Sequence, residues 1–263
     1  MRHNALEIYG KKLPIPVSIS MTKEITSWYS NALHTEMPIA TYGHYGFALL
    51  LIPTAAADYL EYERFQLIQA LEPFIDAGKI KVFSINSMNK ESWMNHNMLP
   101  EHKAIRHNQF NEYVLNEVIP FIKNHTSPET MTYTCGASFG ALHAMNLFLK
   151  RPDIINGVIS MSGVYNLTAY TNGFWDEQVY FNSPAHYIPN LTDENYLTKL
   201  RSSHHIHIYA GSGPYEDPEA SKQFSSILFD KGIWNNLEIW GEDVPHEWST
   251  WLKMLPYILS TKF

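Results

Sequence analysis

One serine of this sequence stands between two glycines, where a strand-like stretch gives way to a helix-like one. It is Ser138, in Gly136-Ala137-Ser138-Phe139-Gly140, with the β-forming MTYTC before it and ALHAMNLFL after it. A tight strand-to-helix turn holds such a hydroxyl out above a sheet, and small residues two before and two after let strand and helix pass closely. The pattern predicts a nucleophile at Ser138; the alternative is a glycine turn that carries an inert serine.

A serine hydroxyl needs a histidine base, and that base needs an acidic group to orient it. In folds with this turn, the acid and then the histidine follow the serine along the chain. His186 and His246 both lie downstream, and His246 follows the last expected strand, in WGEDVPHEWSTW. Because a base belongs on a loop after a strand, His246 is the predicted base; the alternative is a solvent-exposed histidine that caps a helix.

The acid is expected in the loop SGPYEDPEA, which follows the preceding strand. Glu216 and Asp217 are closest to the strand end, whereas Glu219 already belongs to the next helix. Glu216 is preferred because Asp217 stands directly before Pro218 and could cap that helix, with proline at its first position. Asp217 stays open as the alternative.

Alternating strand and helix patterns supply the elements that would bring these residues together. Strands are expected at 46–53, 79–87, 130–138, 156–165, 204–211 and 236–240, and helices at 62–79, 109–125, 139–152, 218–232 and 246–259. This alternation predicts an α/β fold in three layers, with a mostly parallel sheet and helices on both faces. Residues 6–20 are expected to form an antiparallel N-terminal hairpin. We expect one domain over residues 1–263, with irregular insert loops at about 88–107 and 164–203.

Composition narrows the class of protein. A net charge of −7 and an isoelectric point near 6.0 argue against nucleic-acid or anionic-membrane partners. The N-terminus lacks the pattern of a signal peptide, and the longest apolar run, GFALLLIPTAAA, is too short to span a bilayer. The single cysteine, Cys135, excludes an internal disulfide framework and is expected to be a core residue. We therefore expect a cytoplasmic protein.

Two further clusters have both a functional and a structural interpretation. The histidines of HHIH (204–207) could suggest a metal site, but on a strand only His205 and His207 share a face. No metal site is predicted there. The aromatic segment YTNGFWDEQVYFNSPAHY (170–187) could line an acyl or aromatic substrate pocket, or simply pack a cap on the core.

The sequence resembles the α/β-hydrolase superfamily, and within it the esterase D-like group of S-formylglutathione hydrolases, feruloyl esterases and bacterial mycolyltransferases. The matching segments are GASFGALHAMN, RPDIINGVISMSGVYN, AGSGPYE and HEWSTW. The last is similar to the His-x-Trp-x-x-Trp around the catalytic histidine of mycolyltransferases and small bacterial esterases. The resemblance implies a triad of Ser138, Glu216 and His246. Since some members use aspartate as the acid, it does not settle the choice between Glu216 and Asp217.

The resemblance also bears on the oxyanion hole. The His-Gly-Gly-Gly segment of lipases is absent, and IPTAAADYLEYE stands in its place. The resemblance implies that the backbone N–H groups of Ala55 and Phe139 hold the developing oxyanion, which requires no particular side chain.

These observations predict a serine esterase that cleaves small-molecule carboxylic esters through an acyl-enzyme, with no metal or organic cofactor. The alternatives are an acyltransferase on the same triad and a non-catalytic binding protein on a hydrolase scaffold. The sequence leaves homo-oligomer formation open.

Overall fold

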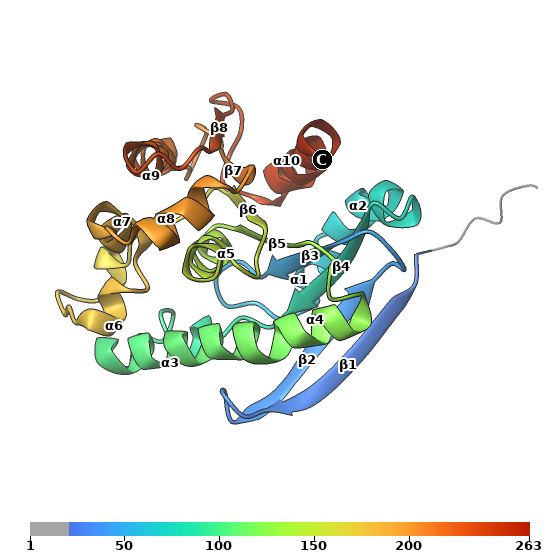
Figure 1. Cartoon of the computed structure of the whole chain (residues 1–263), viewed down its shortest axis with the longest axis horizontal. Coiled ribbons are helices and arrows are strands. Elements are labelled where there is room, and N and C mark those ends of the chain that lie inside the picture. Colours follow the sequence, from blue (N-terminus) through green and yellow to red (C-terminus); the bar gives the residue numbers. More distant parts are fainter. Residues whose placement is uncertain (1–20) are drawn as a thin grey trace, which may run out of the picture.

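The computed structural model describes residues 21–263, which form a sheet covered by helices (Figure 1). The described part begins with an antiparallel pair, β1 (Lys23–Ser30) and β2 (Thr35–Tyr42). The antiparallel opening of the sheet is therefore confirmed, but these strands were not predicted. The hairpin expected at 6–20 lies outside the described residues.

The sheet has eight strands in the order β1-β2-β4-β3-β5-β6-β7-β8. The remaining strands are β3 (Phe47–Ile52), β4 (Ile80–Ile85), β5 (Thr132–Ala137), β6 (Gly157–Met161), β7 (His205–Ala210) and β8 (Asn236–Ile239). From β4 to β8 along this order every neighbouring pair is parallel. The ends of β5, β7 and β8 therefore point to one edge of the sheet, where Ser138, Glu216 and His246 follow them in the chain.

Helices cover both faces of the sheet, and alternate residues of each strand point into different layers. Leu50 packs in a cluster with side chains of α3 (Pro100–Tyr113), α5 (Phe139–Lys150) and α9 (Pro218–Asp230). Leu49 and Leu51 pack in another with α2 (Leu67–Asp76) and α10 (Trp248–Lys262). Figure 1 shows α2 and α10 together, away from α3, α5 and α9. The predicted three-layer arrangement is confirmed.

Two predicted helices have different boundaries in the structure. The helix expected at 62–79 is divided into α1 (Glu61–Arg64) and α2, because Gln66 between them adopts a left-handed φ of 65°. The helix expected at 109–125 begins earlier, at Pro100, and continues through a π-turn (Val114–Val118) into α4 (Ile119–His125). The end of the insert expected at 88–107 is therefore helical.

The insert expected at 164–203 contains three α-helices that the sequence did not suggest. They are α6 (Glu177–Tyr180), α7 (Pro184–Tyr187) and α8 (Glu194–Arg201). Asp193 caps the N-terminus of α8, where its carboxylate accepts hydrogen bonds from the amides of Asn195 and Tyr196. Within residues 21–263, no helix is long and apolar enough to cross a membrane.

Three buried histidines make the stability of the protein depend on pH. His107 on α3, His143 on α5 and His207 on β7 are each at most 2% exposed. Burial lowers the pKa of His143 to about 3 and that of His207 to about 4. As the pH falls below the ordinary histidine pKa, the unfolded chain takes up protons that the native protein does not. The free energy of unfolding should then fall by about 1.4 kcal/mol per pH unit for each such histidine.

We expect the free energy of unfolding of His207→Gln to fall less steeply with decreasing pH than that of the wild type, because one of the three buried histidines is absent. Urea unfolding of wild type and variant between about pH 7 and about pH 5 measures it, because the comparison cancels the carboxylates that both proteins share. His102→Gln, at an exposed position on α3, should leave the slope unchanged. Equal slopes in His207→Gln and wild type would contradict the prediction.

Candidate active site

Ser138 occupies the turn between β5, which ends at Ala137, and α5, which begins at Phe139. Its backbone has φ 56° and ψ −123°, a conformation that is strained for a residue with a side chain. The Ser138 amide donates to the carbonyl of Met161 at 2.9 Å, which fixes the turn to the end of β6. The serine therefore stands on a rigid turn at the carboxyl edge of the sheet.

Both glycines of the pattern are required by the close packing of this turn. A Cβ on Gly136 would lie 2.3 Å from the backbone of Gly140. A Cβ on Gly140 would lie 2.4 Å from the carbonyl oxygens of Ile52 and Pro53. The glycines thus let α5 pass directly over β5 and against the end of β3, as the sequence pattern predicted.

The structure brings Ser138, His246 and Glu216 together. The Nε2 atom of His246 lies 2.9 Å from the Ser138 Oγ, and its Nδ1 lies 3.4 Å from Oε2 of Glu216. The Glu216 side chain is 1% exposed and that of His246 is 25% exposed. A histidine between a serine hydroxyl and a buried carboxylate is the arrangement that general-base activation of serine requires.

Backbone hydrogen bonds join the two loops that carry Glu216 and His246. The His246 amide donates to the carbonyl of Pro214 at 3.0 Å, and the Gly213 amide donates to that of Val244, also at 3.0 Å. The separation of His246 from Glu216 is therefore restrained by main-chain contacts between the segments that lead up to these two residues.

The alternative residues are engaged with other neighbours. Asp217 caps α9, where its Oδ1 accepts a hydrogen bond from the Ala220 amide at 3.1 Å. His186 lies in the insert, with its Nδ1 2.8 Å from the Ser183 Oγ and its ring against that of Trp175. This geometry favours Glu216 over Asp217 and His246 over His186.

Sequence reasoning missed two residues that hold Glu216 and His246 in place. Ser162, at the end of β6, donates to Oε1 of Glu216 at 2.6 Å and accepts from Nε1 of Trp251 at 3.0 Å. The Trp251 ring also packs edge-on against that of His246, with centroids 5.2 Å apart. Trp251 is the second tryptophan of HEWSTW, so the motif itself was the available signal, but its partner Ser162 could be found only in three dimensions.

The two expected oxyanion donors are backbone amides with no competing acceptor. Within residues 21–263, neither Phe139 N–H, at the first turn of α5, nor Ala55 N–H donates to a protein group. Beside Ala55, the amide and hydroxyl of Thr54 donate to the buried carboxylate of Glu61 at 2.8 and 2.5 Å. Glu61, another residue that sequence reasoning missed, therefore fixes one end of the loop that carries Ala55.

The histidine cluster and the cysteine occupy structural positions. His205 and His207 share a face of β7, as expected, with Nδ1 of one 3.4 Å from Nε2 of the other, and His205 stacks on Phe263. No group of three or more His, Cys, Asp or Glu side chains suited to a metal occurs in the part of the chain described. Cys135 is fully buried in β5, and burial raises the pKa of its thiol.

Part of the insert at 164–203 lies beside the turn that carries Ser138. The Tyr170 ring packs edge-on against Phe139, with centroids 5.0 Å apart. Val164, Tyr170 and Phe174 are partly exposed and pack on a small buried cluster that contains Phe139. The insert thus places apolar side chains next to the residue that follows Ser138.

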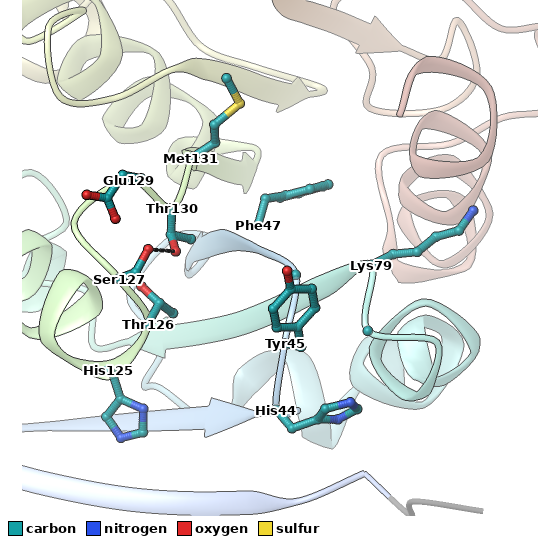
Figure 2. Close-up of a pocket in the computed structure, with 12 residues that line it drawn as sticks. His44, Tyr45, Phe47, Lys79, His125, Thr126, Ser127, Glu129, Thr130 and Met131 are labelled. Atoms are coloured by element: carbon teal, nitrogen blue, oxygen red, sulfur yellow. Dashed lines mark hydrogen bonds between the residues drawn. The ribbon is translucent and has the colours of Figure 1, made fainter. Parts of the chain in front are cut away.

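A cavity of about 580 Å³ lies at the opposite edge of the sheet (Figure 2). Its lining includes Phe47 at the start of β3, and Lys79 and Met131, which directly precede β4 and β5. The dashed line in Figure 2 joins Ser127 and Thr130, whose hydroxyls are 3.1 Å apart. Because parallel strands start at this edge and end at the other, this cavity is separate from Ser138.

Comparison with known proteins gives a family and a fold. The family model described as "Putative esterase" matches residues 65–259. No curated protein matches the chain.

A solved ferulic acid esterase is 15% identical with a TM-score of 0.70, over 92% of this chain and 99% of that one. An S-formylglutathione hydrolase from Agrobacterium tumefaciens is 12% identical with a TM-score of 0.69, over 93% and 95%. Mycobacterium tuberculosis MPT51 is 15% identical with a TM-score of 0.68, over 91% and 97%. These likenesses establish the α/β-hydrolase fold.

Proposed function

Since the chain belongs to the esterase family, we propose that it hydrolyses carboxylic esters with Ser138 as nucleophile, His246 as base and Glu216 as the acid that orients the base. The contact of 2.9 Å between the Ser138 Oγ and His246 Nε2, on a turn that holds the serine in a strained conformation, carries this proposal. No step of the proposed reaction needs a group outside these side chains, two backbone amides and water.

In the first half of the reaction, the Ser138 Oγ attacks the ester carbonyl carbon while His246 Nε2 accepts its proton. The carbonyl π electrons move onto oxygen, and the amides of Phe139 and Ala55 stabilise this oxyanion. Glu216 stabilises the imidazolium through Nδ1–H. When the oxyanion collapses, the C–O bond to the alcohol breaks and His246 protonates the departing oxygen, leaving an acyl-serine.

In the second half, water is the nucleophile and the Ser138 Oγ is the leaving group. His246 takes a proton from water, whose oxygen attacks the acyl carbon, and the same amides hold the second oxyanion. Collapse breaks the bond to the Ser138 Oγ, which recovers its proton from His246, and releases a carboxylic acid. Removal of one donor from an oxyanion hole typically lowers kcat by a factor of about 10²–10³.

We further propose that Val164, Tyr170 and Phe174 line the acyl side of the site. Their support is that they are partly exposed and pack on the cluster around Phe139, next to the nucleophile. We also propose that the chain acts as one domain, because its eight described strands form one sheet. A cytoplasmic location stays a prediction, and homo-oligomer formation stays open.

Labelling with a fluorophosphonate probe tests the proposed nucleophile. A phosphonyl group should be transferred to the Ser138 Oγ with loss of fluoride, and peptide mass spectrometry should locate it in the segment that contains Gly136–Gly140. Pre-incubation with nitrophenyl acetate should slow the labelling. A folded protein that the probe leaves unmodified would favour the non-catalytic alternative, and an ester product formed from added alcohol at the expense of acid would favour acyl transfer.

A further inference from the structure

Four buried side chains form a line of hydrogen bonds that ends on the loop of the proposed oxyanion hole. Trp93 Nε1 lies 3.0 Å from His107 Nδ1, and His107 Nε2 lies 3.1 Å from His143 Nδ1. His143 Nε2 lies 2.9 Å from Asn89 Oδ1, and Asn89 Nδ2 donates to the carbonyl oxygen of Ala55 at 2.5 Å. The line therefore joins α3 and α5 to the loop after β3.

The two ends of the line fix the direction of every bond in it. An indole N–H can only donate and a carbonyl oxygen can only accept. His107 therefore accepts at Nδ1 and donates from Nε2, and His143 does the same. Asn89 then accepts from His143 at Oδ1 and presents its amide hydrogen to Ala55. Each neutral imidazole has one donor and one acceptor, so all these groups are satisfied together.

Burial keeps this arrangement in its neutral form. Trp93, His107, His143 and Asn89 are each at most 2% exposed. Burial lowers the pKa of His107 well below its ordinary value and that of His143 to about 3. Neither imidazole gains a second proton near neutral pH, which would turn its accepting nitrogen into a donor that faces another donor.

The bond to the Ala55 carbonyl restricts the peptide group that carries the Ala55 N–H. The peptide before it is held at the Thr54 amide by Glu61. The peptide after it is held at the Ala55 carbonyl by Asn89 at 2.5 Å and by the Ser87 hydroxyl at the longer distance of 3.1 Å. The peptide group between these anchors has little freedom to rotate. Phe139 and His143 both stand on α5, one turn apart, so the same helix positions both amides of the hole.

We propose that Asn89 and His143 are positioning residues of the oxyanion hole, and that the line from Trp93 to Asn89 aims the Ala55 N–H at the developing oxyanion. This inference rests on the proposed function. It assigns to a buried polar cluster outside the triad a role in the rate of ester cleavage.

Asn89→Leu tests it, because leucine has a similar size and no N–H for the Ala55 carbonyl. Steady-state hydrolysis of nitrophenyl acetate should show kcat lowered by about tenfold to a hundredfold, with KM changed by less than about twofold. The affinity of a trifluoromethyl ketone, which forms an oxyanion on Ser138, should fall by a similar factor. A role in folding alone would change neither quantity in the protein that remains folded.

Asn235→Leu is the matched control. Asn235 is 3% exposed, its Oδ1 accepts from the Ser225 hydroxyl at 2.7 Å, and its Nδ2 donates to the Ser225 carbonyl at 3.3 Å. The variant Asn235→Leu should lose about as much stability as Asn89→Leu and should keep the wild-type kcat. Equal losses of kcat in the two variants, or a wild-type kcat in Asn89→Leu, would overturn the inference while leaving the proposed function intact. Activity retained by Ser138→Ala would instead overturn both.

If Asn89→Leu does not fold, two substitutions at His143 carry the same test. His143→Gln keeps an amide N–H that can reach Asn89, so its kcat should stay within about threefold of wild type. His143→Leu removes that donor and should lose about tenfold or more in kcat. Indistinguishable kcat values in these two variants would overturn the inference.

Discussion

Ser138→Ala should lower kcat for nitrophenyl acetate by about four to six orders of magnitude, the range found when serine triads lose their nucleophile. The loss is large because no other hydroxyl lies on the turn, so the route through an acyl-serine is lost and only direct attack by water on the ester remains. The oxyanion donors would remain in place, since both belong to the backbone. Some acceleration above the uncatalysed rate should therefore survive.

The variant should fold normally, because alanine keeps the Ser138 amide that donates to Met161. Circular dichroism and the thermal midpoint check this directly. Ser127→Ala is a suitable control, since Ser127 lies at the opposite edge of the sheet in the cavity of Figure 2. It should keep the wild-type kcat. Substantial activity in Ser138→Ala would mean that another residue is the nucleophile.

The central part of the site could be predicted from the sequence because its constraints are local. The turn at Ser138 needs glycine at two fixed positions, and the structure shows that backbone atoms occupy the space a Cβ would take at each. His246 could be predicted as the base because a base is expected on a loop after a strand, and the alternation of strands was clear. Both inferences use only neighbours in the chain.

The supporting residues could not be found this way, because their partners are distant in sequence. Ser162 contacts Glu216 and Trp251 across separations of 54 and 89 residues, and His143 contacts Asn89 across 54. Nothing local marks a buried histidine as part of a hydrogen-bonded line. Such contacts appear only when the sheet has brought the loops together.

The same reasoning explains the errors in the predicted elements. The strand β2 contains Pro38, and β1 is largely exposed, so neither has the alternating or continuous apolar pattern of a typical strand. The helix α3 places Lys103, His107 and Asn111 on its buried side, which hides its period. Buried polar residues are thus one reason that the end of the segment at 88–107 resembled a loop.

Glu216→Gln should lower kcat by about three to four orders of magnitude, whereas Asp217→Asn should leave it within about twofold. Glutamine keeps the shape of the side chain but removes the charge that stabilises the imidazolium at His246. Asparagine at 217 changes only a helix cap and is itself a good cap.

Stability provides the complementary measurement for this pair. Asp217→Ala should lower the free energy of unfolding by about 1 kcal/mol through loss of the bond to the Ala220 amide, with kcat unchanged. Glu216→Gln should remain folded, as its circular dichroism and thermal midpoint would show, so that its loss is one of rate. The assignment of the acid would be wrong if Asp217→Asn lost the activity and Glu216→Gln kept it.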